Sequence, residues 1–219
     1  MNLTIDTGTK AGPVSGILHL PDKARALLVF AHGAGAGMRH SFMETMSGLL
    51  ADRGVGTLRY QFPYMEAGRG QPDRPQVLEA TVLAAVTEAG RLGRGVPLFA
   101  GGKSMGGRMS SGAAAKAPLP GVKGLIFFGF PLHPPGNRGT ARADHLSQVT
   151  VPMLFIQGTR DSLAELQLIK EVVGYLVARA KLYVVEEGDH SFHVLKRSGK
   201  TDAQVLGEIA DVVAAGMVS

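Results

Sequence analysis

The 219-residue chain contains no cysteine, which excludes disulfide bonds and thiolate zinc sites. It also lacks any apolar stretch close to the roughly 20 residues that span a bilayer. Residues 1–6 show neither the basic region nor the apolar run of a secretory signal. We therefore expect a cytoplasmic protein that does not bind membranes.

Dense basic runs are absent as well, although the formal net charge is +5 and the sequence pI is about 9.6. The lysines and arginines are scattered and no aromatic residues are interleaved with them, so nucleic-acid binding is not expected. Only 6% of the residues are aromatic, but 45% are hydrophobic. This length and composition predict a single domain over residues 1–219, with one core.

Apolar runs, glycine-rich turns and helical stretches alternate along the chain. This repetition predicts an α/β fold in which a mostly parallel central sheet has helices on both faces, a three-layer sandwich. Residues 2–6 and 14–20 predict an antiparallel pair. Further strands are expected at 26–31, 54–60, 96–100, 122–130, 152–157 and 181–185, and helices at 41–53, 75–92, 164–178 and 203–215. Ligands of such sheets bind at the carboxyl ends of the strands, so functional residues should follow these runs.

Residues 102–106 read Gly-Lys-Ser-Met-Gly and fit the G-x-S-x-G pattern, directly after the apolar run 96–100. In this pattern a serine lies on a sharp, strained turn between a strand and a helix, and glycines avoid a collision between the two. The small residues after Ser104 suit a helix packed closely on a sheet. Ser104 is therefore the candidate nucleophile. The alternative is a glycine-rich turn that carries a serine by chance.

A phosphate-binding Walker A loop is a rival interpretation of the same residues. It requires a glycine where the chain has Pro97, and a free loop where it has an apolar strand. No later apolar strand ends in an aspartate suited to hold magnesium beside such a loop. The nucleophile turn is favoured.

Glycines alternate in residues 32–37, which read His-Gly-Ala-Gly-Ala-Gly. In a serine hydrolase such a loop supplies one backbone N–H of the oxyanion hole, and the residue after the nucleophile supplies the other. The candidate donors are Ala34 or Gly35, together with Met105. A dinucleotide-binding G-x-G-x-x-G motif fails because its third glycine falls at Met38. A plain glycine-rich turn is the alternative.

Asp161 follows the run 152–157 and is the candidate acid. A carboxylate just past this strand can orient the imidazole of a catalytic histidine. Asp161 could also cap the following helix, and the two roles are compatible. Asp144 and Glu165 are weaker candidates.

Two histidines follow the last predicted strand. A histidine between that strand and the C-terminal helix can reach the serine and accept its proton. We favour His190, which directly follows a Gly-Asp turn, over His193, which we expect on the helix. A surface histidine is the alternative for either. The order Ser104, Asp161, His190 is typical of this architecture.

No histidines and carboxylates show metal-ligand spacing, so neither a metal nor another cofactor is expected. The other histidines considered are expected to be structural or exposed: His19, His40 and His145.

With this turn, loop, acid and histidine, the chain resembles the α/β-hydrolases over nearly its whole length. It is most similar to small dienelactone-hydrolase-like proteins, in the branch shared with the hydrolase-like domain of the NSL-complex subunit 3. Segments 58–64, 130–136 and 158–161 carry that finer resemblance. Dienelactone hydrolase itself has a cysteine nucleophile, which this chain lacks, so a serine esterase is favoured over a lactonase.

The expected reaction is acyl transfer to Ser104, with His190 as general base and then general acid and Asp161 holding the imidazole. Residues 132–151 are too few for a substantial lid, which predicts an open site for small carboxylic esters. Thioesters and peptides are alternative substrates. A binding or scaffold module with little turnover is the alternative class of function.

Several cations are expected near the mouth of the site: Arg39, Arg59, Lys103 and Arg160. One or more of them could bind an anionic group of the substrate. Pairing with local carboxylates such as Glu66 or Glu186 is the alternative. His133 is expected to shape the rim or to contact the substrate.

Overall fold

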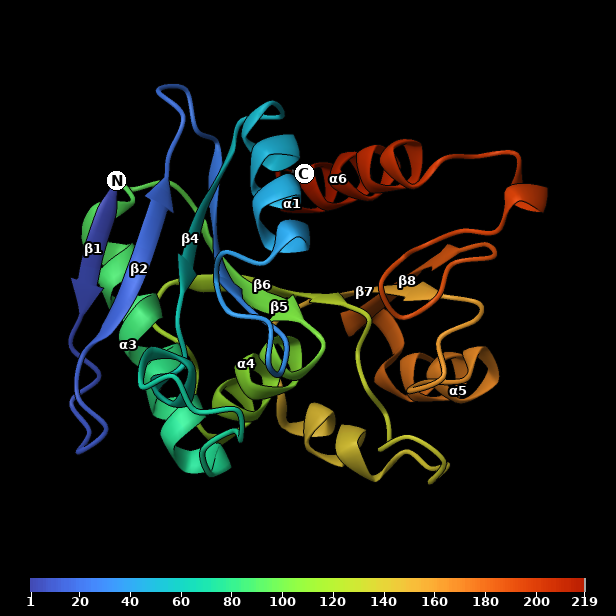
Figure 1. The fold of residues 1–219 in the computed structure, drawn as a ribbon, viewed down its shortest axis with the longest axis horizontal. Coiled ribbons are helices and arrows are strands. Elements are labelled where there is room, and N and C mark those ends of the chain that lie inside the picture. The colour runs from blue at the N-terminus through green and yellow to red at the C-terminus, as the bar shows by residue number, and fades with distance from the viewer. Residues whose placement is uncertain (219) are drawn as a thin grey trace.

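The structure, a computed structural model, describes residues 1–218 and contains an eight-stranded sheet between two layers of helices (Figure 1). The strand order is β1-β2-β4-β3-β5-β6-β7-β8. The strands are β1 (Asn2–Ile5), β2 (Val14–His19), β3 (Ala26–Ala31), β4 (Val55–Tyr60), β5 (Leu98–Lys103), β6 (Val122–Phe128), β7 (Met153–Gly158) and β8 (Ala180–Val185). β2 is antiparallel to β1 and to β4, and the remaining pairs are parallel. The predicted sheet is confirmed.

The helices also follow the prediction, with local differences. The α-helices are α1 (Ser41–Ala51), α2 (Pro63–Glu66), α3 (Pro75–Leu92), α4 (Met105–Lys116), α5 (Leu166–Leu176) and α6 (Asp202–Val218), and the 3-10 helices are η1 (Ala141–Gln148), η2 (Val177–Arg179) and η3 (Lys196–Ser198). The helix predicted at 164–178 is shorter because Val177 adopts a φ of 51°, which ends α5 and begins η2. None of the helices within residues 1–218 is long and apolar enough to cross a bilayer.

Each face of the sheet is buried under its own helices. α1 and α6 cover one face, and α3, α4 and α5 cover the other (Figure 1). Successive β3 residues alternate between the two cores: Leu28 and Phe30 point toward α1 and α6, Leu27 and Val29 toward α3 and α4. A strand buried on both sides needs apolar residues at every position, which explains the continuous run in the sequence.

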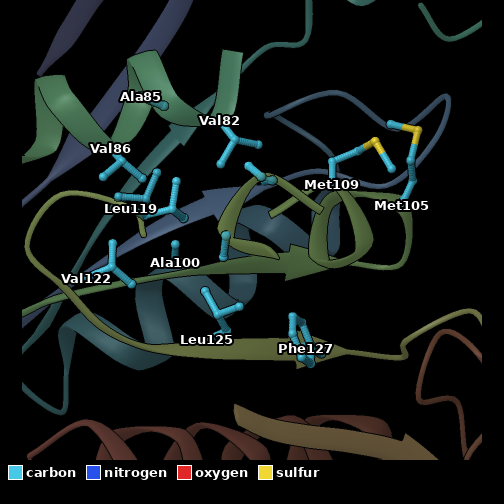
Figure 2. Close-up of a cluster of buried hydrophobic side chains, with 14 of the residues drawn as sticks. Val82, Ala85, Val86, Ala100, Met105, Met109, Leu119, Val122, Leu125 and Phe127 are labelled. Carbon is cyan, nitrogen blue, oxygen red and sulfur yellow. The ribbon is translucent and has the colours of Figure 1, made fainter. Parts of the chain in front are cut away.

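Figure 2 shows the core on the face of the sheet that α3, α4 and α5 cover, where side chains of α3 and α4 pack on the sheet. Val82 and Val86 of α3 lie over Ala100 of β5, while Leu125 and Phe127 line the same core from β6. α4 also packs on β5, and the turn between these two elements carries Ser104. The connection from β6 to β7 holds η1, which packs on α4 from the outer side.

Candidate functional site

Ser104 lies on the turn between β5 and α4 in a strained conformation, with φ 51° and ψ −116°. Positive φ is uncommon for residues other than glycine. A Cβ at Gly102 would lie 2.2 Å from the Ala31 carbonyl oxygen, and one at Gly106 would lie 2.4 Å from the same oxygen. Both flanking glycines are therefore required by the close approach of this turn to β3, as the sequence predicted.

A chain of hydrogen bonds joins Ser104, His190 and Asp161. His190 Nε2 is 2.9 Å from Ser104 Oγ, and His190 Nδ1 is 2.7 Å from Asp161 Oδ2. The Asp161 carboxylate is buried and also accepts hydrogen bonds from Gln157 Nε2 (2.5 Å) and the Leu163 backbone N–H (2.8 Å). Because a carboxylate only accepts, Nδ1 of the imidazole is the donor, which leaves Nε2 free to accept the serine proton.

The loop that carries His190 is fixed by local hydrogen bonds. Asp189 Oδ1 accepts the backbone N–H groups of Ser191 (2.8 Å) and His193 (3.0 Å). From the other side, Lys103 Nζ donates to the His190 carbonyl oxygen. Lys103, which directly precedes Ser104, thus holds the backbone of His190.

The other acid and base candidates lie elsewhere. The prediction that His193 lies on the helix is wrong: it belongs to the loop before α6, and its Nδ1 is 2.7 Å from Asp202 Oδ2. That hydrogen bond raises the pKa of His193. Asp144 is exposed on η1, and Glu165 is bound by other side chains. Neither carboxylate contacts His190 within the part of the chain described.

Of the three candidate oxyanion donors, Ala34 and Met105 keep backbone N–H groups without an acceptor in residues 1–218. Gly35, the other candidate, donates its N–H to the Tyr64 hydroxyl at 3.0 Å and is therefore occupied. Ala34 lines the cavity beside Ser104, and no acceptor in residues 1–218 takes its N–H or that of Met105. Met105 is the first residue of α4, where N–H groups have no partner in the helix and attract negative charge.

His32, to which the sequence assigned no role, fixes the start of this loop. It is fully buried; Nδ1 lies 2.7 Å from the Gly33 carbonyl oxygen, and Nε2 accepts the Phe62 N–H at 3.1 Å. Burial lowers the pKa of His32 to about 4, so the ring is neutral at neutral pH. A histidine directly at the end of an apolar strand was the available signal.

A cavity of about 610 Å³ opens beside Ser104, on the side of the sheet that α1 and α6 cover. It is lined by Gly33, Ala34, Ala36, His40, Ser41, Phe42, Met43, Thr45, Lys103, Ser104, Leu163, His190, Ser191, His193 and Leu206. Sequence reasoning missed the part contributed by the start of α1, because no motif marks it. No lining residue comes from the connection between β6 and β7.

Of the predicted substrate-binding residues, only Lys103 lines this cavity. Arg59 is 8% exposed; its Nη1 donates to the Met38 carbonyl oxygen at 3.0 Å and lies 3.6 Å from Glu44 Oε1. Arg160 is exposed and donates to the Glu187 carbonyl oxygen at 3.0 Å. The structure therefore does not bring these two arginines to the cavity beside Ser104.

His133 does not line the cavity but contacts Leu163, a residue that does. It is buried; Nε2 is 2.7 Å from Glu165 Oε2, and Nδ1 is 2.9 Å from the Pro134 carbonyl oxygen. Hydrogen bonds from Arg138 and then His133 hold the pKa of Glu165 at about 2. The backbone N–H of His133 donates to the carbonyl oxygen of Leu163, a lining residue, so His133 acts on the cavity only indirectly.

Comparisons with known proteins agree with this architecture. The family model described as an alpha/beta hydrolase domain matches residues 24–218. A dienelactone hydrolase from Anabaena variabilis has a TM-score of 0.77 at 19% identity, and the alignment covers 98% of this chain and 94% of that one. A Xanthomonas campestris serine hydrolase without a lid has a TM-score of 0.77 at 20% identity, covering 100% and 95%. The predicted α/β-hydrolase fold is confirmed, as is the resemblance to lid-less dienelactone-hydrolase-like proteins; the relation to the NSL-complex subunit 3 stays a prediction.

Curated relatives share sequence over part of their length. A protein from two Mycobacterium tuberculosis strains, provisionally named a phosphoribosyl transferase, is 29% identical over 188 residues. The alignment covers 82% of this chain and 40% of that protein, so the chain spans about two fifths of the relative's length.

Proposed function

The chain belongs to the α/β-hydrolase domain family, and on this premise we propose that it is a serine hydrolase that cleaves small carboxylic esters through an acyl-enzyme. The observation that carries the proposal is the hydrogen-bonded chain from buried Asp161 through His190 to Ser104, on a strained turn at the edge of a cavity. Proton relays of this geometry generate a serine nucleophile.

In the proposed mechanism Ser104 Oγ attacks the carbonyl carbon while its proton passes to His190 Nε2. Asp161 stabilises the resulting imidazolium, and the N–H groups of Ala34 and Met105 bind the oxyanion. The tetrahedral intermediate collapses, and His190 protonates the departing alcohol. Water then attacks the acyl-enzyme with His190 again as base, which releases the acid and restores Ser104.

Two other activities are not favoured by any contact in the site. A scaffold has no need of a strained serine whose histidine is held by a buried carboxylate. The phosphoribosyl transferase name belongs to a relative of which this chain spans two fifths, so we do not extend that activity to it. Thioesters share the acyl chemistry and belong in the same substrate panel.

A fluorophosphonate probe tests the proposal directly. We expect the folded protein to be labelled at Ser104, as located by peptide mass spectrometry, and Ser104→Ala to remain unlabelled. Ser111→Ala is the matched control, because Ser111 is a second serine in hydrogen-bond contact with a histidine. A panel of 4-nitrophenyl esters and matching thioesters then measures turnover. A folded protein without labelling and without turnover would favour the scaffold.

A further inference from the structure

A second cavity, the outer cavity, lies between α3, α4 and η1, on the face of the sheet that α3 and α4 cover (Figure 1). Its volume is about 340 Å³. Its ionisable lining residues are Glu79 of α3, Arg108 and Lys116 of α4, and His145 of η1. No residue lines both this cavity and the one beside Ser104. A molecule in the outer cavity therefore does not occupy the proposed site of ester hydrolysis.

Arg108 is the unusual residue of the outer cavity. Its side chain is half-buried, and Nε is shielded from solvent without a hydrogen-bond acceptor in residues 1–218. Within the same residues its guanidinium forms no ion pair, whereas the neighbouring Lys116 does. Since a guanidinium has five N–H donors and accepts nothing, Arg108 is built to receive an acceptor that the chain itself does not supply.

The charges around Arg108 favour an anion. The carboxylate that lines the outer cavity, that of Glu79, accepts a hydrogen bond from Lys116 Nζ, so these two charges balance. Burial lowers the pKa of Arg108, and the positive charge of Arg142 lowers it further, while Glu79 acts in the opposite direction. A half-buried cation beside a second cation costs free energy, and an anion bound between them offsets that cost.

The contact between Ser111 and His145 closes one wall of the outer cavity. His145 lines the cavity from η1, and its Nε2 lies 2.7 Å from Ser111 Oγ on α4. The Ser111 hydroxyl in turn donates to the Arg108 carbonyl oxygen at 3.0 Å. This chain of contacts fixes η1 against the turn of α4 that carries Arg108, so the cavity has a defined wall.

We propose that the outer cavity binds a phosphate group, either the free ion or the phosphate of a small phosphorylated molecule, with Arg108 as its main ligand and Arg142 as a second positive charge. The planar fork of guanidinium donors matches the oxygens of a phosphate, and its double charge matches two arginines. The cavity also leaves room for an organic group beyond the phosphate. This binding is separate from ester hydrolysis and does not depend on it.

Calorimetric titration and thermal unfolding test the proposal, with inorganic phosphate as the first probe and chloride at matched ionic strength as the reference. We expect saturable phosphate binding. At a phosphate concentration of about a hundred times Kd, Tm should rise by roughly 5 to 10 °C. Glycerol 3-phosphate is the second probe. Tighter binding than that of phosphate would identify a phosphorylated molecule as the ligand, and equal or weaker binding would identify the free ion.

Variants assign the site. Arg108→Met should weaken phosphate binding roughly tenfold or more, the size of a charge-assisted hydrogen bond. Because it removes a cation without a partner, it should leave the Tm without phosphate unchanged or raise it, whereas loss of a merely structural arginine would lower that Tm. Arg142→Met, on η1, should weaken binding severalfold and keeps the test open if Arg108→Met fails to fold. Arg91→Met is the matched control, since Arg91 pairs with Glu88 outside the cavity; it should bind phosphate like the wild type.

Two results would overturn the proposal. One is a Tm and a titration in phosphate no different from those in chloride. The other is phosphate binding that survives Arg108→Met and is lost in Lys103→Met, which would place the anion beside Ser104 instead. Neither measurement uses turnover, so both results leave the proposed serine hydrolase standing.

Discussion

The turn after β5 and the helix α4 that follows it carry two serines that each contact a histidine from elsewhere in the chain. Only one of these two serine–histidine pairs has the environment of a nucleophile. Ser104 Oγ is 2.9 Å from His190 Nε2, and Ser111 Oγ is 2.7 Å from His145 Nε2. By distance alone the second pair is the closer one. A serine–histidine contact is therefore not sufficient evidence of catalysis.

The surroundings of the two pairs differ in three ways. Ser111 is fully buried within α4, and its hydroxyl also lies 3.0 Å from the Arg108 carbonyl oxygen. No carboxylate in residues 1–218 orients His145, whose pKa is lowered by burial and then by Arg108. Ser104, in contrast, lines a cavity on a strained turn, and a carboxylate holds its histidine. Access, backbone strain and an oriented base distinguish the proposed nucleophile.

The largest expected effect comes from removing each serine hydroxyl. Ser104→Ala should lower kcat for 4-nitrophenyl acetate by roughly 10⁴-fold or more, because the acyl-enzyme cannot form. Ser111→Ala should change kcat by no more than a few fold. Steady-state rates, with circular dichroism to verify folding, decide the matter. Equal losses in both variants would remove the distinction between the two pairs.

The next effect concerns the carboxylate that only the first pair has. Asp161→Asn should reduce kcat by roughly 10³- to 10⁴-fold, because the amide no longer fixes the imidazole tautomer or stabilises the imidazolium. Asp144→Asn, near His145 on the exposed side of η1, is the matched control and should retain activity. Turnover of the same ester measures both. Full activity in Asp161→Asn would contradict the proposed relay.

The close approach of α4 to β3 beside Ser104 predicts a stability difference between two glycines of α4. A Cβ at Gly106 would lie 2.4 Å from a backbone oxygen, whereas one at Gly112 would lie 2.7 Å from Glu79 Oε1, the end of a flexible side chain. Gly106→Ala should lower the free energy of unfolding by about 3 kcal/mol or prevent folding. Gly112→Ala should be nearly neutral, since alanine also favours helix by up to about 1 kcal/mol. Urea unfolding curves measure the difference; similar midpoints would show that the turn tolerates a Cβ.

Local patterns predicted most of the fold and three residues whose side chains the structure brings together at the candidate site. Continuous apolar runs identified the parallel strands, since both faces of these strands are buried. The G-x-S-x-G spacing predicted Ser104 as the candidate nucleophile, and positions directly after predicted strands predicted Asp161 and His190. Each of these signals depends on residues close together in the sequence.

Several of the misses depend on partners distant in the sequence. Gly35 is occupied because Tyr64 from another loop accepts its N–H, and Arg59 is withdrawn because Met38 and Glu44 bind it. The start of α1 joins the cavity only through tertiary packing, so no local pattern indicates it. Gln157 was visible as an amide ending an apolar strand, but its contact with Asp161 was not.

The last effect is a gradual dependence of stability on pH, from a histidine outside both pairs. Burial lowers the pKa of His32 to about 4, from an unfolded value of about 6.5. Between these values the unfolded chain binds the proton and the folded chain does not, so stability falls as the pH falls from about 6.5 to about 4. The full loss of stability is about 3 kcal/mol.

Urea unfolding at stepped pH should show this slope in the wild type and a smaller slope in His32→Gln. His145→Gln should also reduce the slope, because burial lowers its pKa as well, whereas its effect on kcat should be slight. An unchanged slope in His32→Gln would mean that other groups cause the acid sensitivity. A large loss of kcat in His145→Gln would instead indicate that the second pair affects catalysis.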